Sequence, residues 1–275
     1  NILSKLPSVA TELAKEKGKL RVDLDTDLKS KSRAYGMTHV ELPPQGLSAQ
    51  AVRDLLRAAS EAENAVWQAG KCSGSVYHGG AEHQALLNEA FSLYSLANPL
   101  HADVFPSLIK FEAEIVSMTA SLVGGGAGGR AVKGGTTSGG TESIVLAIKA
   151  HRDFYRTEHG VSQPDMICCV TAHAAVDKAC DMLGIRLKKV LADPTTQRVD
   201  VAAVKAAIGP NTILIYGSAP NFPSGTVDDI PSLGALALRY GTGLHVDCCL
   251  GGFVLPFMRK LGYETPAFDF SVPGV

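Results

Sequence analysis

The stretch MICCVTAHAAVDKACDMLGIRLKKV, from Met166 to Val190, decides the fold of this chain. Two runs of strand length, the apolar MICCV and the mixed IRLKKV, enclose a segment with helical spacing over Ala174–Leu183. A strand, a helix and a second strand in that order predict two parallel strands joined by a crossover helix.

The same alternation continues towards the C-terminal end of the chain. Strands are expected at Thr212–Tyr216 and Leu244–Val246, and helices at Val201–Ile208, after a capping Asp200, and at Ile230–Tyr240, before Gly241. Short apolar strands separated by helices predict an α/β fold with a mainly parallel sheet and helices on both faces. In such sheets ligands bind beyond the carboxyl ends of the strands, so functional residues are sought there.

The first part of the chain has a different, mostly helical pattern. Helices are expected at Ile2–Lys17, from a capping Ser48 to about Trp67, and at Ser107–Val123, with an irregular connection over Asp23–Gln45. Their apolar stripes are interpreted as core-facing. The sequence therefore predicts an N-terminal helical segment, residues 1–70, followed by a large ligand-binding domain, residues 71–275.

Composition excludes several classes of function. Hydrophobic residues make up 45% of the chain and charged residues 19%, which is typical of a soluble globular protein. The formal net charge of −1 provides no global field that would attract nucleic acid or an anionic membrane. No apolar run reaches the roughly 18–20 residues that a membrane-spanning helix needs. A small or mixed-charge ligand is the expected partner.

The six cysteines are interpreted as buried, reduced thiols rather than metal ligands. The adjacent pairs Cys168–Cys169 and Cys248–Cys249 lie in runs that resemble strands, where neighbouring side chains point to opposite faces. Neither pair is therefore suited to bind one metal ion, and no C-x-x-C spacing is present. No metal site is expected.

The segment GGTTSGGTES, Gly134–Ser143, is the most informative candidate for a binding site. Glycines let backbone N–H groups approach an anion, and the hydroxyl groups of Ser138, Thr141 and Ser143 add donors. A helix expected from about Ile144 to Tyr155 would add the positive end of its dipole, which favours a phosphate. Taken alone, the segment is explained equally well as an ordinary capped turn.

Two further residues stand at the ends of predicted strands. Asp247 ends the run LHVD, where a carboxylate can hold a protonated pyridine nitrogen, although such an Asp commonly caps the next turn. His173 follows the strand ending at Val170, where an imidazole can lie flat on an aromatic cofactor, although a single His there is more often exposed or bonded locally. The three signals are stronger jointly than separately.

Several motifs together resemble the lyases that cleave sphingosine 1-phosphate with pyridoxal 5′-phosphate (PLP). The resemblance extends from about Tyr35 to Val275. The motifs that carry it are SGSVYHGG (Ser73–Gly80), ANPLHADVFP (Ala97–Pro106), SGGTES (Ser138–Ser143), TAHAAVDKA (Thr171–Ala179), GSAPNFPSGTVDDI (Gly217–Ile230), LHVDCCLGGF (Leu244–Phe253) and FDFSVPGV (Phe268–Val275). SGGTES and HVD recur across a wider group of decarboxylases, whereas the combination favours the lyases. The resemblance implies the PLP-dependent transferase fold of the aspartate aminotransferase type (fold type I).

The resemblance also implies a role for each matching residue. The phosphate of PLP would be bound by Ser138, Gly139, Gly140 and Thr141. His173 would stack on the ring, and Asp247 would pair with the pyridinium nitrogen. Asn98 would contact the cofactor or the reacting centre of the substrate, and Tyr77 and His101 would face the substrate phosphate. Without the resemblance, His101 is interpreted as packed in a loop and Tyr77 as a core aromatic residue.

The implied reaction splits a phosphorylated sphingoid base into a long-chain aldehyde and phosphoethanolamine. The alternatives are an amino-acid decarboxylase with the same PLP site and a non-catalytic, truncated relative. In the family the lysine that links to PLP lies shortly after the PGV segment, whereas this sequence ends at Val275. The chain as given is therefore expected to lack that lysine, the end of the large domain and the small C-terminal domain, and to be inactive by itself.

The resemblance further implies a homodimer and a place in sphingolipid metabolism. A eukaryotic protein of this kind would lie at the endoplasmic reticulum membrane, with its catalytic domain on the cytosolic face, through a segment absent here. Otherwise a cytoplasmic location is expected. No nucleic-acid partner is implied.

Overall fold

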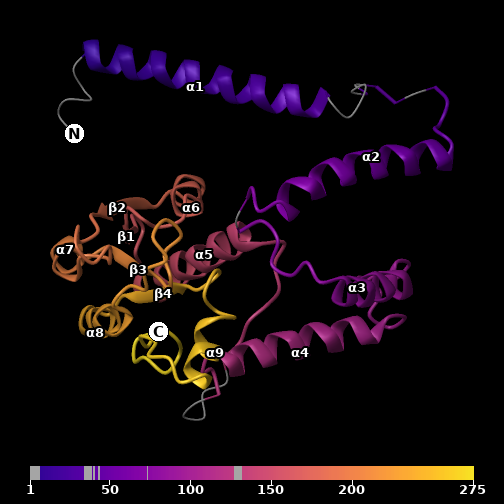
Figure 1. Ribbon diagram of the computed structural model, residues 1–275. Coiled ribbons are helices and arrows are strands. Elements are labelled where there is room, and N and C mark those ends of the chain that lie inside the picture. The colour runs from indigo at the N-terminus through magenta and orange to yellow at the C-terminus, as the bar shows by residue number, and fades with distance from the viewer. Residues whose placement is uncertain (1–6, 34–38, 40, 43, 73, 127–131) are drawn as a thin grey trace. The chain divides into compact units, whose positions relative to one another are not determined.

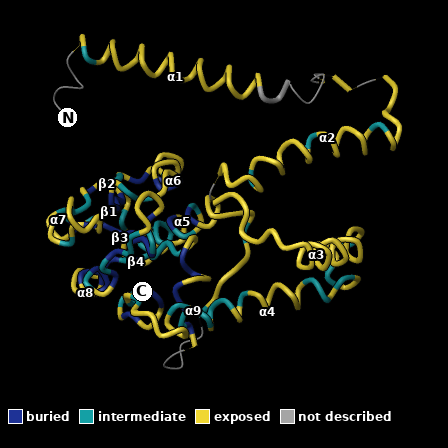
Figure 2. The backbone as a smooth tube through the Cα atoms, viewed as in Figure 1, coloured by how far each residue is buried: buried dark blue, intermediate teal, exposed yellow. Residues whose placement is uncertain are grey.

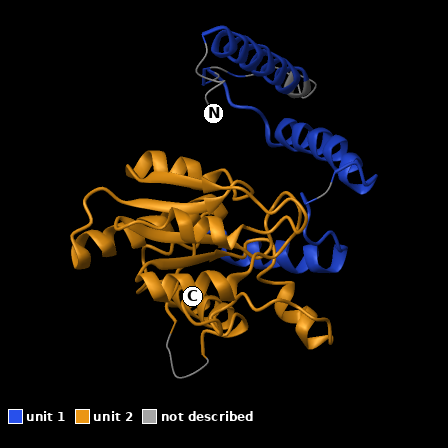
Figure 3. Cartoon of the chain, turned by 90° about the vertical axis from the view of Figure 1, so that its left-hand side faces the viewer, with its two compact units in different colours: residues 1–96 blue, residues 97–275 orange. Residues whose placement is uncertain are grey.

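The computed structural model describes residues 7–33, 39, 41–42, 44–72, 74–126 and 132–275. Contacts between residues divide the chain into two compact units, Asn1–Leu96 (unit 1) and Ala97–Val275 (unit 2), which Figure 3 distinguishes by colour. Each unit is described by itself. The domain boundary expected after residue 70 stays a prediction.

Unit 1 is helical in its described part. Its helices are α1 (Pro7–Arg33), α2 (Ala49–Gln68) and α3 (Ala81–Tyr94). The prediction for α2 is confirmed: it begins directly after Ser48, whose hydroxyl oxygen accepts a hydrogen bond from the N–H of Ala51 at 3.1 Å. Within the described residues, none of the helices is both long and apolar enough to cross a membrane.

The prediction for α1 is wrong at its C-terminal end. The helix continues beyond Lys17 to Arg33, through part of the segment expected to be irregular, and residues 2–6 lie outside the described part of the chain. The added turns carry oppositely charged side chains one helical turn apart, such as Lys29 and Asp25, whose charged atoms are 2.5 Å apart. Such pairs stabilise an exposed helix, which has no apolar stripe from which it could be predicted.

Unit 2 contains a parallel sheet and six helices in its described part, of which α5, α6, α7 and α8 pack on the sheet (Figure 1). Its helices are α4 (Pro106–Leu122), α5 (Gly140–His159), α6 (Ala175–Leu183), α7 (Val201–Ala207), α8 (Ile230–Tyr240) and α9 (Leu255–Lys260), and its strands are β1 (Asp165–Cys169), β2 (Arg186–Val190), β3 (Thr212–Ser218) and β4 (Gly243–Asp247). All neighbouring strands run parallel, in the order β2-β1-β3-β4. The prediction of a parallel sheet is confirmed.

The central strands β1 and β3 are buried on both faces, as the dark tube in Figure 2 shows. One face buries Met166, Leu214 and Tyr216 together with residues of α5 and α6. The opposite face buries Ile167 and Ile215 together with residues of α7 and α8. Because both faces are covered, the strand sequences are continuous apolar runs rather than alternating ones.

Two boundaries in unit 2 differ from the sequence-based expectation. Helix α5 begins at Gly140 instead of Ile144, so Gly140 and Thr141 lie in its first turn. The start of the helix was predicted too late because glycine has a low helix propensity. The first turn of a helix nevertheless tolerates glycine. Strand β4 ends at Asp247, so Cys248 and Cys249 lie in the following turn and not in a strand. The sequence also gave no prediction for α3 and α9.

The cysteines are only partly buried, which corrects the expectation for two of them. Cys168, Cys169 and Cys180 are buried, with Cys168 and Cys169 on opposite faces of the sheet as predicted. Cys72 and Cys249 are exposed. Among the described residues, no group of three or more His, Cys, Asp or Glu side chains is arranged to hold a metal ion.

Candidate functional site

The glycine-rich segment leads into α5, which begins without a side-chain cap. Gly139 occupies the capping position and has no side chain to accept hydrogen bonds from the first turn. By contrast, Asp200 and Asp229 cap α7 and α8 with their carboxylates. The N–H groups of Gly140 and Thr141 have no acceptor within their own helix, so this end of α5 can donate to an external anion.

Hydroxyl and carboxylate side chains surround the start of α5. Thr137 Oγ1 lies 2.7 Å from Ser143 Oγ, and the N–H of Ser138 donates to Oε2 of Glu142 at 2.6 Å. Hydrogen bonds from the side chain and backbone of Ser138 lower the pKa of Glu142. The Ser138 amide therefore already binds a carboxylate. An incoming anion must use the remaining first-turn amides or displace this side chain.

The start of α5 lies against the turn that follows β4. A Cβ atom added to Gly140 would lie 3.3 Å from Sγ of Cys249, which is closer than an ordinary contact. The N–H of Cys249 in turn donates to Oδ1 of Asp247 at 3.0 Å. The structure therefore brings the glycine-rich segment and Asp247 together at one site.

Asp247 ends β4, half-buried, and both of its carboxylate oxygens accept hydrogen bonds from neutral donors. The hydroxyl of Tyr216 donates to Oδ2 at 2.5 Å, and the Cys249 amide donates to Oδ1. None of the ion pairs among the described residues involves Asp247. The carboxylate is held in place while, within the described chain, it has no cationic partner.

Three groups next to Asp247, namely Tyr216, His245 and Cys248, are neutral near pH 7. Burial, and then the charge of Asp247, raise the pKa of the Tyr216 hydroxyl, so it keeps its proton and remains a donor. Burial lowers the pKa of His245 to about 4, and burial together with Asp247 raises the pKa of Cys248 to about 11. The end of β4 therefore presents a single negative charge in a partly dehydrated setting, which suits a cationic ligand group.

His173 lies in the turn between β1 and α6, where the sequence predicted it. Its Nδ1 accepts a hydrogen bond from the N–H of Ala175 at 3.1 Å, so the proton of the neutral ring is on Nε2. The ring is exposed and meets Phe222 edge-on, with 6.4 Å between centroids. Strand β3 separates β1, which His173 follows, from β4, which Asp247 ends.

The structure does not join the remaining predicted residues to this site. Asn98 and His101 are exposed in the loop before α4, where Asn98 Oδ1 accepts from the N–H of Leu100 at 3.0 Å. The N–H of His101 donates to the carbonyl oxygen of Asn98 at 3.1 Å. Tyr77 belongs to unit 1 and is 88% exposed, so it is not the core residue that was the alternative. The roles assigned to these three side chains stay predictions.

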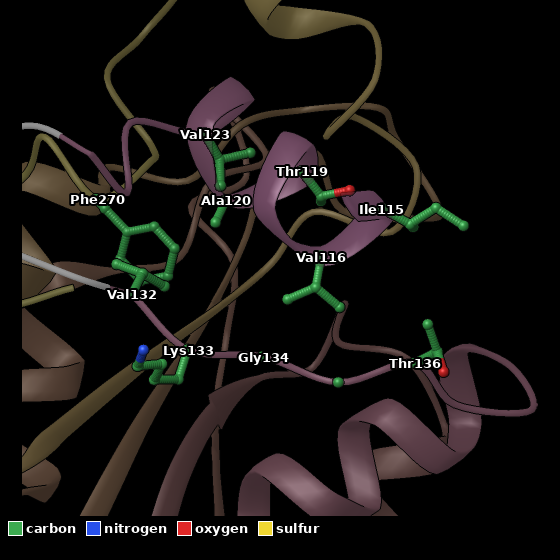
Figure 4. Close-up of a pocket in the computed structure, with 11 residues that line it drawn as sticks. Ile115, Val116, Thr119, Ala120, Val123, Val132, Lys133, Gly134, Thr136 and Phe270 are labelled. Atoms are coloured by element: carbon green, nitrogen blue, oxygen red, sulfur yellow. The ribbon is translucent and has the colours of Figure 1, made fainter. Parts of the chain in front are cut away.

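A pocket of about 220 Å³ lies beside the glycine-rich segment. Figure 4 shows Val116 of α4, Val132 and Phe270 around it, with Lys133 and Thr136 on the irregular segment that leads to α5. The Oγ1 atom of Thr136 donates to a carboxylate oxygen of Glu112 in α4 at 2.5 Å. The lining is mostly apolar and includes neither Asp247, nor His173, nor any residue of α5, so this pocket is distinct from the start of α5.

Sequence reasoning missed the residue that touches Asp247 most closely. Tyr216 ends the apolar run TILIY and was interpreted as part of a strand only. Its contact with Asp247 depends on the register that pairs Tyr216 with His245 in adjacent strands. A single sequence carries no signal for that register, so the pattern alone could not identify this residue.

Comparison with known proteins now adds to this geometry. The profile of the pyridoxal-dependent decarboxylase conserved domain matches residues 62–270. The sphingosine-1-phosphate lyase of Dictyostelium discoideum is 45% identical over 273 residues, which cover 99% of this chain and 50% of that protein. The lyase of Arabidopsis thaliana is 47% identical over 279 residues, covering 100% of this chain and 50% of that protein. This chain therefore spans about half the length of these curated relatives.

The solved structures give the same result. A sphingosine-1-phosphate lyase of Burkholderia pseudomallei superposes with a TM-score of 0.83 at 41% sequence identity, covering 87% of this chain and 56% of that chain. The resemblance to these lyases is confirmed, and so is the expected fold of PLP-dependent enzymes.

Proposed function

Because the chain belongs to the pyridoxal-dependent decarboxylase family, we propose that the protein containing it is a PLP-dependent carbon–carbon lyase acting on phosphorylated sphingoid bases. One structural observation carries the proposal. Asp247, without a cationic partner among the described residues, lies beside the uncapped start of α5. An anion site and a carboxylate next to each other match the two ends of a pyridine ring that bears a phosphate.

The donor set of the site fits PLP. The first-turn amides of α5, with Ser138, Gly139, Gly140 and Thr141, would hold the phosphate, because these amides have no acceptor within the helix. Asp247 would hold a proton on the ring nitrogen, and His173 would cover one face of the ring. When bound, PLP supplies the electron sink for cleaving a bond next to an amine. The chain contributes orientation and the charge that keeps the ring nitrogen protonated.

The substrate class follows from the relatives and is supported by two side-chain types. An imidazole at His101 and a phenol at Tyr77 are both donors suited to a phosphate oxygen. Asn98 would act near the reacting centre. Cleavage would give a long-chain aldehyde and phosphoethanolamine, so the phosphate should contribute to binding although it takes no part in the bond that breaks.

The family description itself favours a second candidate, an amino-acid decarboxylase. It would use the same phosphate site, His173 and Asp247, but it would not need Tyr77 and His101 as phosphate donors. The test is to supply the protein that contains this chain with a phosphorylated sphingoid base, its unphosphorylated form and free amino acids. We expect aldehyde and phosphoethanolamine from the first substrate only. Release of CO2 from an amino acid, without aldehyde formation, would replace the lyase by the decarboxylase.

We also propose that the protein is a homodimer. The apolar stripe of α2 was expected to face a core, but Val52, Leu55 and Leu56 are exposed, and no residue of α2 is buried in the described part of unit 1. An apolar stripe of this kind is typical of a surface that another chain covers. Light scattering on the native protein should give twice the monomer mass, and a monomer would refute this. Location at the cytosolic face of the endoplasmic reticulum, or in the cytoplasm, stays a prediction.

A further inference from the structure

Tyr216 is a fully buried aromatic residue whose polar end reaches the proposed cofactor site. Its side chain is 1% exposed and packs in the same cluster as Met166 and Leu214, under α5 and α6. The hydroxyl donates to Oδ2 of Asp247 at 2.5 Å, from β3 to the end of β4. A phenylalanine would fill the apolar part of this buried position equally well. Packing therefore does not account for the hydroxyl group.

The hydroxyl and the Cys249 amide hold different oxygens of the same carboxylate. Tyr216 donates to Oδ2 from the neighbouring strand, and Cys249 donates to Oδ1 from the turn after β4. Two donors from two segments define the plane of the carboxylate, whereas one donor would let it rotate. Both donors are neutral, so they orient the charge of Asp247 without cancelling it. Hydrogen bonds to an ionised group are also stronger than those between neutral groups.

We propose that Tyr216 is a positioning residue, which holds the Asp247 carboxylate in the orientation that pairs with the ring nitrogen of the cofactor. This inference rests on the proposed function, because it takes PLP as the ligand. It adds a residue from β3 that the sequence analysis did not assign to the site. Tyr216 acts through Asp247, so its effect must depend on the presence of a nitrogen in the ligand ring.

The test compares two ligands and two variants of the protein that contains this chain. The ligands are PLP and its carbocyclic analogue, in which a C–H group replaces the ring nitrogen. The test variant is Tyr216→Phe. The control is Tyr155→Phe, because the Tyr155 hydroxyl donates to the carbonyl oxygen of Gly241 at 2.9 Å, at the other end of β4. Both substitutions delete one hydroxyl and keep the aromatic ring. Dissociation constants are measured by titration of the cofactor-free protein.

Tyr216→Phe should weaken PLP binding about tenfold, the effect of losing most of one hydrogen bond to a charged group. Binding of the carbocyclic analogue should change less than twofold, because that ligand makes no use of the oriented carboxylate. Tyr155→Phe should leave both constants unchanged. Equal weakening for the two ligands, or no weakening for either, would overturn the positioning role. If Tyr216→Phe does not fold, 3-fluorotyrosine at position 216 serves as the second variant, because it keeps the ring and the hydroxyl and changes only the strength of the donor. It should then change PLP affinity more than that of the analogue, and an equal change for both ligands would overturn the role.

The outcomes also separate this inference from the proposed function. A native protein that binds PLP and shows the ligand-dependent effect of Tyr216→Phe, but cleaves no sphingoid base, supports the role of Tyr216 and refutes the lyase. A native protein with lyase activity and equal effects on the two ligands supports the lyase and refutes the role of Tyr216. A native protein that binds neither ligand refutes the cofactor assignment and the inference together.

Discussion

Two aspartates lie at opposite ends of the strands in the same parallel sheet, and their partners differ in charge. Asp165 begins β1, is fully buried, and forms ion pairs with Arg186 and Lys188, each at 2.8 Å. Asp247 ends β4, is half-buried, and accepts hydrogen bonds only from the neutral Tyr216 hydroxyl and the Cys249 amide within the described chain. The described chain itself neutralises the charge of Asp165, whereas the charge of Asp247 is available to a cationic ligand.

The difference separates a residue that serves stability from one that serves binding. Burial acts to raise the pKa of Asp165, but hydrogen bonds from Lys188, Thr212 and Arg186 outweigh it, and the pKa is lowered. Its ionised form is therefore fully compensated in the folded chain. Asp247 is oriented but not compensated, which is the arrangement expected for a carboxylate that pairs with a cationic ligand.

Removing Asp165 should have the largest effect on stability. Asp165→Ala leaves the ammonium group of Lys188, which is 25% exposed, without its carboxylate, and breaking such a pair costs about 3–5 kcal/mol. Asp177→Ala is the matched control, because Asp177 pairs with Lys189 at the surface at 2.6 Å and should cost less than about 1 kcal/mol. Denaturant unfolding measures both losses. Similar losses for the two variants would remove the distinction between the buried and the exposed pair.

Asp247→Asn should reverse this pattern. The substitution keeps the shape of the side chain and an acceptor for one donor, so the free energy of unfolding should change by less than about 1 kcal/mol. The affinity for PLP should fall about 100-fold, because the partner of a protonated ring nitrogen is lost. Titration of the cofactor-free protein measures the affinity. A large loss of stability with unchanged PLP affinity would make Asp247 a structural residue like Asp165.

Acidification should lower the free energy of unfolding in two steps, the first at His245 and the second at Asp165. The pKa of His245, two residues before Asp247, is lowered by burial to about 4, against about 6.5 in the unfolded chain. The folded state therefore binds fewer protons than the unfolded state between these values, and stability falls as pH drops through this window, by about 3 kcal/mol. The contribution of Asp165, whose pKa is lowered, is lost only below its unfolded value of about 3.9.

Two variants distinguish these windows. His245→Gln should flatten the stability curve between about pH 6.5 and 4, and Asp165→Asn should flatten it below about pH 4. Unfolding free energies measured across pH 3–7 would show the difference. A single loss of stability below pH 4 that neither variant changes would mean that other groups dominate the acid response.

The strands and their order along the chain could be predicted because buried strands are apolar in sequence. The runs around Met166 and Ile213 are apolar over the length of a strand, and turn residues such as Gly241 separate them from the helices. The extension of α1 to Arg33 was not predictable in this way, because an exposed helix has no apolar stripe. The late expected start of α5 had a different cause, the low helix propensity of glycine.

The candidate site could be predicted in part for similar reasons. Residues that follow parallel strands gather at one edge, so Asp247 and His173 could be placed there from the sequence. Tyr216 could not, because its contact with Asp247 depends on strand register and not on composition. The partners of Asp165 could not be predicted either, because their contact also depends on strand pairing. Arg186 and Lys188 reach Asp165 because β1 and β2 are neighbours.

The smallest expected effect concerns the contact that joins the anion site to Asp247. A Cβ atom at Gly140 would lie 3.3 Å from Sγ of Cys249, so Gly140→Ala should push the start of α5 away from the end of β4. Alanine is tolerated in the first turn of a helix, and stability should therefore change little. PLP affinity should fall about fivefold, since phosphate and ring nitrogen are held by segments that must keep their spacing.

A rescue variant decides whether spacing is the cause. Cys249→Ala removes Sγ but keeps the backbone N–H that donates to Asp247, so the double variant Gly140→Ala/Cys249→Ala should regain most of the lost affinity. Gly46→Ala is the control, because an added Cβ there meets nothing within 4 Å. If the double variant binds PLP no better than Gly140→Ala, crowding against Cys249 is not the cause. The effect would then lie in the first-turn amide of residue 140 itself, and the anion site and Asp247 would act independently.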